Sequence, residues 1–517
     1  MPHAPMDWLA PLPQADTPRQ LVTSAGTWSR AALAADARAL GAALLAGGAR
    51  PGDIVLAPLP AWALARLFFA CAATGLTLFP LDPAAPPQRR QHLLALAGPR
   101  GRLLEALPEF SSGVASEMQV QMGDGQKVIS ASLPLLPLPD QPALVIATSG
   151  SEGDPKGVVL SHGNLAAAAA ASSQRLPLGP GDTWLACLPL HHVGGQSILT
   201  RCAQAGATAR VLDAFSVEAV ADALAGGSHS PTAPITHLSL VPAMLDRLLA
   251  AGVAPGPLRH VLIGGAALSR TLFNRAREAG WPLAVSYGLS ECAAQVATWV
   301  NPGPDWQEGQ VGSPLPGCRA TVREDGRLVL QGPQVMWGYL NPQGQPGQGL
   351  EMPEDSNGTP AFVTGDLAAQ DEAGRLTILG RADDMLISGG INVHPAEVES
   401  LLLACPGIAD AGVTALPDPV WGDRLVALVA GTIAPDALLQ WCREHLPSSR
   451  RPRRLHRVES LPRNPMGKLQ RPALRELAQR LEAATPANSS ATVVTVASTA
   501  SNTSTAVRPT PAAGNTP

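Results

Sequence analysis

Alanine-rich stretches with a helical pattern alternate with short apolar runs through the first half of this chain. The helical stretches are 30–46, 165–173, 217–224 and 243–251. The apolar runs include 54–56, 143–146, 237–241 and 261–263. Such alternation is typical of strands that are connected by helices covering a parallel sheet. The sequence therefore predicts an α/β fold with mostly parallel strands.

The pattern changes in the second half of the chain. From about residue 309 to 380, short strands are separated by turn residues, which predicts a small β-barrel subdomain. A compact α+β segment follows, and its expected elements are helices at 394–404 and 435–445 and strands at 409–415 and 424–430. Because 517 residues are too many for one core, the chain should divide into domains.

The expected domains are an N-terminal one over 1–382 and a mobile, small α+β C-terminal one over 383–484, with a hinge at Asp383. A tail over 485–517 is rich in Ser, Thr, Ala, Pro and Asn. It is expected to be disordered, because it cannot bury enough apolar surface to offset the entropy of ordering.

Composition excludes several classes of protein. A net charge of −4 gives no basic surface for nucleic acid and no polybasic membrane signal. The seven cysteines form no CxxC pair, which is typical of a reducing compartment. No secretory signal is visible, and the longest apolar run, 67–81, is too short to span a bilayer and reads as a buried helix followed by a strand. We expect a soluble, cytoplasmic protein without membrane insertion, for which a homo-oligomer is left open.

Lysine is rare, and its remaining positions are informative. Of 37 Lys and Arg residues only Lys127, Lys156 and Lys468 are lysines, and the last two lie in the motifs 148–157 (TSGSEGDPKG) and 465–468 (PMGK). An ammonium is a compact charge on a flexible stem, whereas a guanidinium imposes a planar fork. We therefore predict that both lysines act on phosphoryl or carboxylate oxygens of one reaction.

The first motif resembles the phosphate loop of the acyl-adenylate-forming superfamily, which includes acyl-CoA synthetases, peptide synthetase adenylation domains and luciferases. Backbone N–H groups and hydroxyls of such a loop can cradle phosphates. The likeness continues in order to about residue 482, through 286–291 (SYGLSE), 364–367 (TGDL), 380–384 (GRADD) and 462–468 (PRNPMGK). A plain Gly/Ser turn would explain one motif but not five in register.

The resemblance implies ATP, Mg²⁺ and coenzyme A as ligands. It implies Lys468 as the catalytic lysine, Glu291 as the metal ligand, and His192 as a residue bordering the acyl pocket and the coenzyme A tunnel. The implied ATP-binding residues are Thr148, Ser149, Gly150, Ser151, Gly153, Lys156, Gly265, Ala266, Tyr287, Gly288, Ser290, Asp366 and Arg381. Those implied for the coenzyme A tunnel are Ser388, Gly389 and Gly390.

The implied reaction is carboxyl activation. A substrate carboxylate attacks the α-phosphate of ATP, pyrophosphate leaves, and the thiol of coenzyme A then opens the acyl-AMP anhydride. Such chemistry leaves the protein mainly positioning and electrostatic tasks. Lys468 would bridge the carboxylate and the α-phosphate, and Lys156 would hold the β- and γ-phosphates together with Mg²⁺.

Within the superfamily, the segments 192–206, 236–242 and 286–298 look most like o-succinylbenzoate–CoA ligases of menaquinone and phylloquinone synthesis. That substrate carries a second carboxylate, which a cation must hold. Arg201, nine residues after His192, is our candidate, because a guanidinium binds a carboxylate through two hydrogen bonds.

Local sequence alone leaves three of these roles open. Glu291 is equally compatible with a helix-start carboxylate, Asp366 with a turn residue, and Arg201 with an exposed position on a helix. At the level of function, the alternatives are another aryl- or fatty-acid CoA ligase, an adenylation enzyme that loads a carrier protein, and a nucleotide-binding module without turnover. The last of these is suggested only by Glu152, whose charge, with that of nearby Asp154, would repel polyphosphate.

Two other readings are rejected. The His191–His192 pair lacks the Asp-Gly of the acyl-transferring HHxxxDG motif. It is also an improbable metal site, since adjacent side chains point apart on a regular element and no further ligand follows. The segment 288–292 (GLSEC) lacks the final glycine of a serine-hydrolase elbow.

Overall fold

The computed structural model describes most of the chain and divides it into two compact units. The described residues are 7–10, 19–108, 118–122, 125–129, 137–149, 155–226, 233–352, 359–388, 391–418, 422–448, 450–464, 467–484 and 493–495. The larger unit comprises Met1–Met385 together with the loop Arg463–Lys468, and the smaller unit comprises Leu386–Pro462 and Leu469–Pro517. The first segment of the larger unit thus ends two residues beyond the expected hinge at Asp383.

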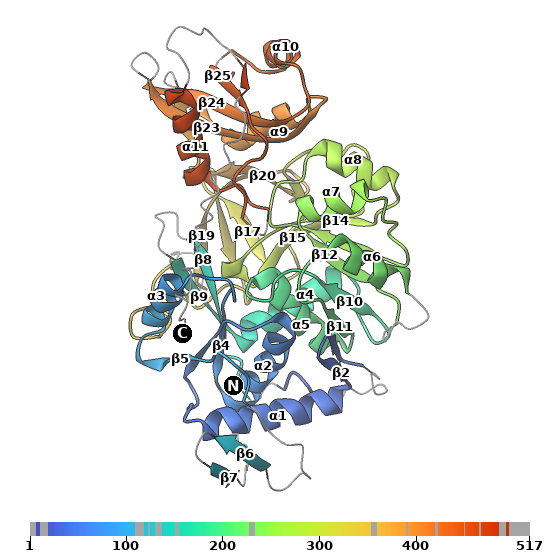
Figure 1. Cartoon of the computed structure of the whole chain (residues 1–517), viewed down its shortest axis with the longest axis vertical. Helices are drawn as coiled ribbons and strands as arrows, with labels where there is room; N and C mark the ends of the chain where they lie inside the picture. The colour runs from blue at the N-terminus through green and yellow to red at the C-terminus, as the bar shows by residue number, and fades with distance from the viewer. Residues whose placement is uncertain are drawn as a thin grey trace, which may run out of the picture. The chain divides into compact units, whose positions relative to one another are not determined.

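The predicted alternation of strands and helices forms two sheets in the larger unit (Figure 1). In spatial order, the eight-stranded sheet contains β15 (Ala294–Val300), β14 (Leu283–Leu289), β13 (His260–Ile263), β12 (His237–Leu240), β10 (Thr183–Ala186), β11 (Thr208–Val211), β1 (Leu21–Thr23) and β2 (Gly26–Trp28). The five-stranded sheet contains β5 (Gly101–Leu103), β3 (Ile54–Ala57), β4 (Thr77–Pro80), β8 (Pro142–Ser149) and β9 (Pro155–Ser161). Pairs inside both sheets are parallel, and antiparallel pairs occur at their ends, as predicted.

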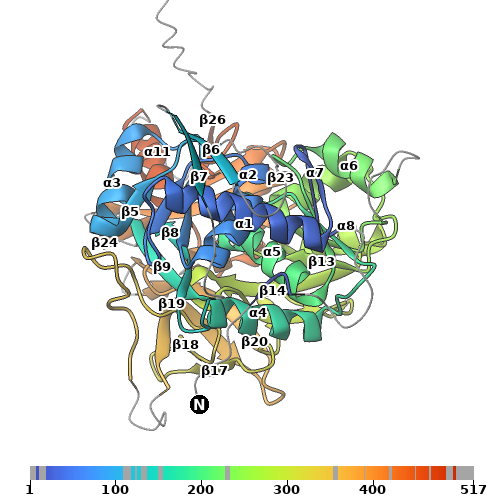
Figure 2. The same ribbon diagram turned by 90° about the horizontal axis from the view of Figure 1, so that it is seen from below.

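Helices cover these sheets. They are α1 (Arg30–Ala46), α2 (Ala61–Thr74), α3 (Pro87–Ala97), α4 (His162–Arg175), α5 (Val193–Ala205), α6 (Val217–Ala225), α7 (Pro242–Ala250) and α8 (Arg270–Glu278), with short 3₁₀ turns η1 (Gly98–Arg100) and η2 (Ser290–Cys292). Figure 2 shows α1 beside α2. The strands β3, β4, β10 and β12 are buried along their whole length, as expected for strands with both faces covered. The run 67–81 is, as predicted, a buried helix followed by a strand.

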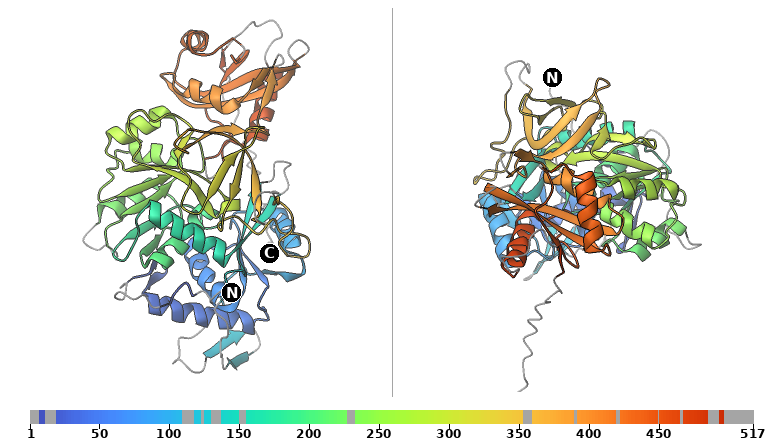
Figure 3. Two further views of the ribbon diagram at one scale, coloured as in Figure 1. Left: turned by 180° about the vertical axis from the view of Figure 1, so that it is seen from behind. Right: turned by 90° about the horizontal axis from the view of Figure 1, so that it is seen from above.

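The β subdomain expected after residue 309 is a five-stranded antiparallel sheet, yellow to ochre in Figure 3. In spatial order its strands are β16 (Gln310–Gly312), β20 (Leu376–Arg381), β19 (Ala361–Gln370), β18 (Arg327–Gln331) and β17 (Arg319–Val322). A separate hairpin pairs β6 (Met118–Met122) with β7 (Gly125–Ile129).

The smaller unit is an α+β fold built on one mixed sheet. Its strands are β21 (Leu386–Ser388), β22 (Ile391–Val393), β23 (Ile408–Asp418), β24 (Gly422–Gly431), β25 (Arg454–Arg457) and β26 (Val493–Thr495), and its helices are α9 (Pro395–Leu403), α10 (Pro435–His445) and α11 (Arg471–Ala483). Alternate residues of β24 face opposite sides. Leu425, Ala427 and Val429 pack with α9 and α10, while Val426 and Leu428 pack with α11.

One segment of the tail forms a strand, whereas the whole tail is expected to be disordered. Residues Val493–Thr495, inside the segment expected to be disordered, form β26 and pair in parallel with β25. Two valines and a threonine in succession are β-branched and favour a strand. The remainder of the tail beyond residue 484 lies outside the described residues.

None of the helices in the described part of the chain is both long enough and apolar enough to cross a membrane. Each of the seven cysteines is a free thiol, and six of them are buried.

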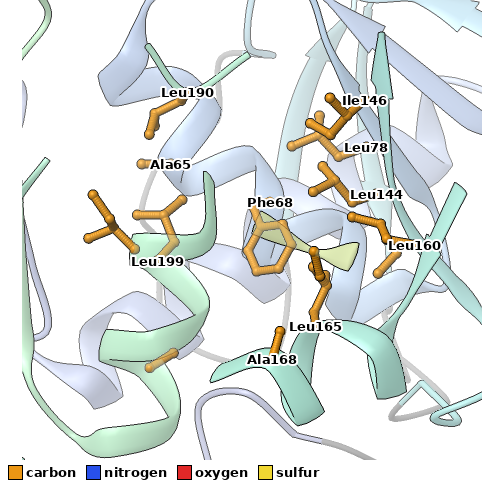
Figure 4. Close-up of a cluster of buried hydrophobic side chains, with 14 of the residues drawn as sticks. Ala65, Phe68, Leu78, Leu144, Ile146, Leu160, Leu165, Ala168, Leu190 and Leu199 are labelled. Carbon is orange, nitrogen blue, oxygen red and sulfur yellow. The ribbon is translucent and has the colours of Figure 1, made fainter. Parts of the chain in front are cut away.

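The largest apolar core joins the two sheets of the larger unit through α2, α4 and α5. Figure 4 shows Phe68 of α2 between Leu199 of α5 and the strand residues Leu144 and Leu160. Phe68 is 1% exposed. This core fixes the elements from which the candidate site is built.

Phe68→Ala should lower the free energy of unfolding of the larger unit by about 3–5 kcal/mol, because it leaves a cavity at the centre of this core. Leu103→Ala, at a position that is 43% exposed, is the control and should change it by less than about 0.5 kcal/mol. Urea unfolding followed by tryptophan fluorescence measures both. Equal losses for the two variants would contradict the central position of Phe68.

Candidate active site

The described ends of the glycine-containing motif that carries Lys156 lie on two paired antiparallel strands. Strands β8 and β9 pair so that Thr148 lies opposite Lys156 and Ser149 opposite Pro155. The Thr148 hydroxyl is 3.5 Å from the carbonyl oxygen of Lys156. The predicted phosphate-loop residues Gly150, Ser151 and Gly153, together with Glu152 and Asp154, lie outside the described residues. Lys156 is exposed on β9.

Tyr339 connects Lys156 with Glu291. The Tyr339 hydroxyl donates a hydrogen bond of 2.9 Å to Oε1 of Glu291, and Nζ of Lys156 lies 5.1 Å from the centre of the Tyr339 ring. Burial and the charge of Glu291 raise the pKa of Tyr339 well above its usual value, so the phenol stays protonated and remains a donor. The backbone of η2 is held as well, because the N–H of Met336 donates to the carbonyl of Glu291 at 2.8 Å. Three chemical functions, an ammonium, a phenol and a carboxylate, are therefore gathered at one place.

Tyr287 orients Asp366, the other carboxylate predicted for the site. Its hydroxyl donates to Oδ2 of Asp366 at 2.5 Å, and burial followed by the charge of Asp366 raises the pKa of Tyr287 well above its usual value. Asp366 and Arg381 are register partners on β19 and β20, with Nη1 and Oδ1 3.6 Å apart. The Thr364 hydroxyl accepts from the N–H of Asp366 at 3.0 Å. Asp366 is thus held at one orientation, beyond what a simple turn residue would need.

Arg381 also reaches the expected hinge. Its Nη2 lies 2.7 Å from Oδ2 of Asp383, which is an exposed residue. A Cβ added to Gly365 would lie 2.5 Å from this Nη2, so glycine is required for the guanidinium to occupy its position.

A close backbone approach explains Gly288, and a positive φ explains Gly265. A Cβ at Gly288 would lie 1.7 Å from the carbonyl oxygen of Ala294, inside the β14–β15 hairpin. Gly265 follows β13 with a φ of +79°, a conformation that favours glycine, and a Cβ there would lie 3.3 Å from Cγ1 of Val241. Ala266 is partly exposed beside Gly265, and Ser290 begins η2 directly before Glu291.

The loop that carries Lys468 is a tight turn of the larger unit. The N–H of Lys468 donates to Oδ1 of Asn464 at 2.9 Å, and the N–H of Asn464 donates to the carbonyl of Lys468 at 2.9 Å. Gly467 has a φ of +73°, and a Cβ there would lie 3.8 Å from Cγ2 of the same Val241 that faces Gly265. The Lys468 loop and the Gly265 turn therefore share a neighbour, and Lys468 is exposed.

His192 immediately precedes α5 and has a neutral ring. Burial, together with the neighbouring His191, lowers the pKa of His192 to about 4. The two histidine rings lie 4.5 Å apart, so the prediction that they point apart is wrong. The physical reason is that both residues lie in the turn before the helix and not on a regular element.

Arg201 lies on α5 and is 2% exposed, so its alternative reading as an exposed helix residue is wrong. Its guanidinium carbon lies 5.1 Å from the centre of the Trp184 ring. Burial lowers the pKa of Arg201 to about 10, which leaves it charged near neutral pH. Within the described part of the chain its guanidinium has no hydrogen bond and no ion pair. A buried cation of this kind favours an anionic ligand, because an unpaired buried charge is costly.

The smaller unit contributes one described residue of the expected coenzyme A tunnel. Ser388 ends β21 and is 9% exposed, while Gly389 and Gly390 lie outside the described residues.

The Glu291 carboxylate suits Mg²⁺ as one oxygen ligand. Among the described residues, no group of three or more His, Cys, Asp or Glu side chains could enclose a metal ion. Mg²⁺ usually takes one or two carboxylates and completes its shell with water and phosphate oxygens. Glu291, held by Tyr339 near Lys156, matches that requirement.

Sequence reasoning missed Tyr339 and Trp184. A compositional signal for the first was present, since the chain has only two tyrosines, Tyr287 and Tyr339. Both hydroxyls donate to predicted site carboxylates. Rarity in the sequence marks Tyr339 as it marks Lys156 and Lys468, whereas nothing in the local sequence marks Trp184.

Two family descriptions match successive parts of this chain. Residues 14–340 match the family described as AMP-binding enzyme, and residues 397–468 match the AMP-binding enzyme C-terminal domain. The 2-succinylbenzoate–CoA ligase of Bacillus cereus is 34% identical over 351 residues, which are 65% of this chain and 70% of that protein.

Solved structures are similar over nearly the whole chain. One is the o-succinylbenzoate CoA synthetase (MenE) from Bacillus subtilis in complex with the acyl-adenylate intermediate OSB-AMP, with a TM-score of 0.77 and 29% identity over 92% of this chain and 99% of that one. The same synthetase in complex with ATP and magnesium ion has a TM-score of 0.76 and 26% identity over 92% and 100% of the two chains.

Tyr339→Phe should raise the Mg²⁺ concentration needed for half-maximal ATP binding about tenfold, because Glu291 loses the hydrogen bond that orients it. Calorimetric titration of ATP at graded Mg²⁺ measures this without turnover. Tyr287→Phe removes the other tyrosine hydroxyl, which does not touch Glu291, and should leave the Mg²⁺ dependence unchanged. An unaltered Mg²⁺ dependence in Tyr339→Phe would exclude Tyr339 as the group that orients Glu291.

Proposed function

This chain belongs to the family of AMP-binding enzymes, and from that premise we propose that it is an o-succinylbenzoate–CoA ligase. The acid and ATP form o-succinylbenzoyl-AMP and pyrophosphate. The thiol of coenzyme A then displaces AMP, so that o-succinylbenzoyl-CoA is the product. The proposed setting is menaquinone or phylloquinone synthesis in the cytoplasm, with small molecules as the partners.

The buried cation on α5 is the observation that carries the choice of acid. Arg201 lies two and a half turns beyond His192, by the geometry of roughly 3.6 residues per turn. Two and a half turns place two positions on opposite sides of a helix, so the choice of acid rests on the burial and charge of Arg201 and not on its direction relative to His192. A substrate with a second carboxylate supplies the counter-charge that the described residues do not. A monocarboxylic acid would leave this cation unpaired.

The nucleotide is held by residues from several elements of the larger unit. Asp366 offers its carboxylate to the ribose hydroxyls, in an orientation set by Tyr287 and Arg381. Lys156, near the start of β9, places its ammonium toward the β- and γ-phosphates. Glu291 would supply one oxygen ligand to Mg²⁺, which when bound offsets phosphate charge.

Lys468 is the residue assigned to the bond-forming step. Its ammonium would stabilise the charge shared by the attacking carboxylate and the α-phosphate oxygens, a task of positioning and electrostatics. Its turn shares Val241 as a neighbour with the Gly265 turn, which supports a role near the nucleotide. His192 is neutral near pH 7 and therefore borders the acyl group without adding charge.

Lys468→Ala should lower acyl-AMP formation by about 10²–10³-fold, because the developing charge loses a preorganised cation. The purified chain is given ATP, Mg²⁺, o-succinylbenzoate and coenzyme A, and pyrophosphate, AMP and thioester are measured separately. Arg277→Ala, an exposed change on α8, is the control and should be as active as the unaltered chain.

Each product pattern of this assay decides between functions. Thioester from the unaltered chain supports the proposal. Pyrophosphate without thioester would instead indicate carrier loading, and no pyrophosphate with any acid would indicate a binding module without turnover. Acyl-AMP formation unaffected by Lys468→Ala would overturn the assignment of that lysine.

Arg201→Ala should raise KM for o-succinylbenzoate about 30-fold or more, because a buried charge pair is lost, and should change KM for a monocarboxylic aryl acid far less. Steady-state kinetics with both acids give the two values. The control is again Arg277→Ala. Equal effects on the two acids would remove Arg201 as the anchor of the second carboxylate.

A further inference from the structure

The Trp184 ring lies beside the Arg201 guanidinium. Trp184 lies on β10, is 1% exposed, and its ring centre is 5.1 Å from the guanidinium carbon. We propose that Trp184 is a positioning residue that selects dicarboxylic acids by holding Arg201 in place while leaving its N–H donors free. The proposal rests on the proposed function, since it assigns Arg201 to the second carboxylate.

The indole of Trp184 is itself held in one orientation. Its Nε1–H donates to the Ser239 hydroxyl on β12 at 3.0 Å. The His237 ring, also on β12, stacks with it at 5.0 Å between ring centres and 29° between planes. Trp184 and His237 are register partners in this parallel pair of strands. The indole therefore has a fixed direction, as a platform for another group requires.

The His237 ring, which stacks on Trp184, carries no positive charge that would repel Arg201. Burial, followed by the neighbouring His260, lowers the pKa of His237 to about 4. His237 is therefore neutral near pH 7, and the stack of imidazole and indole does not repel the guanidinium. The Thr236 hydroxyl lies 2.9 Å from Nδ1 of His237, which fixes the imidazole in turn.

An aromatic platform differs from a carboxylate partner in what it leaves available. A carboxylate would occupy the guanidinium N–H groups that the substrate must use and would compete with it. A ring attracts the cation by its face, whereas the five N–H donors of the guanidinium lie in its own plane. Trp184 can thus stabilise buried Arg201 in the free protein without occupying the donors. The planar, weakly hydrated guanidinium suits this arrangement better than an ammonium.

The test compares Trp184→Leu, which removes the aromatic face, with Trp184→Phe, which keeps a smaller one. Trp184→Leu should raise KM for o-succinylbenzoate about tenfold, and Trp184→Phe should raise it about two- to threefold. In both, kcat with that acid, KM for ATP and KM for a monocarboxylic aryl acid should change less than about twofold. Trp441→Leu, in the smaller unit, controls for the loss of an indole and should leave the KM values unchanged.

Combination with Arg201→Ala separates positioning from a general structural role. If Trp184 acts through Arg201, adding Trp184→Leu to Arg201→Ala should not raise KM for the dicarboxylic acid further. An additional increase in the double variant, or equal increases for both acids in the single variant, overturns the proposal. Thermal unfolding of each variant is also measured, to show whether the variant is folded. Trp184→Phe alone and with Arg201→Ala carries the same comparison if Trp184→Leu does not fold.

Failure of the proposal and failure of the proposed function give different results. If the unaltered chain forms no thioester from o-succinylbenzoate, or if Arg201→Ala affects both acids equally, the proposed function or its anchor fails. If Arg201→Ala is selective for the dicarboxylic acid and the Trp184 variants are not, only the role of Trp184 is overturned.

Discussion

Two hydrogen bonds from tyrosine hydroxyls to carboxylates are the interactions on which the candidate site depends. Tyr287 holds Asp366, and Tyr339 holds Glu291, so the two acidic groups assigned to ribose and to Mg²⁺ each have a fixed direction. A phenol whose pKa is raised donates without adding charge. A neutral phenol therefore orients a carboxylate without adding a positive charge beside it. No other tyrosine occurs in the chain.

The two cations of the site are held in a similar way, each beside an aromatic ring. Lys156 lies over the ring of Tyr339, and Arg201 lies over the ring of Trp184. Aromatic faces hold these cations at moderate strength and leave their donors unoccupied. In the proposed enzyme, whose ligands would be a triphosphate and a dicarboxylic acid, this arrangement keeps the binding groups in position before the ligand arrives. Tyr339 takes part in both kinds of interaction, because its ring lies beside Lys156 and its hydroxyl donates to Glu291.

Much of the fold was predictable because it follows from local pattern. The helices expected at 30–46 and 435–445 have those bounds in the structure, and β23 and β24 contain the strands expected at 409–415 and 424–430. The family was predictable too, since five motifs occurred in register. The interpretation of His191 and His192 was wrong in one respect, because a turn, unlike a regular element, lets adjacent rings approach.

The sequence by itself determined the order of strands and helices, because this order depends on residue type and spacing along the chain. Its motifs, through the resemblance that they carry, also indicated the class of chemistry. Only the tertiary structure decided that Tyr339 meets Glu291 across 48 residues and that Tyr287 meets Asp366 across 79. It also decided that Arg201 is buried against Trp184. Periodicity states which face of an element is apolar, but the distant segment that covers this face is chosen by packing of the whole domain.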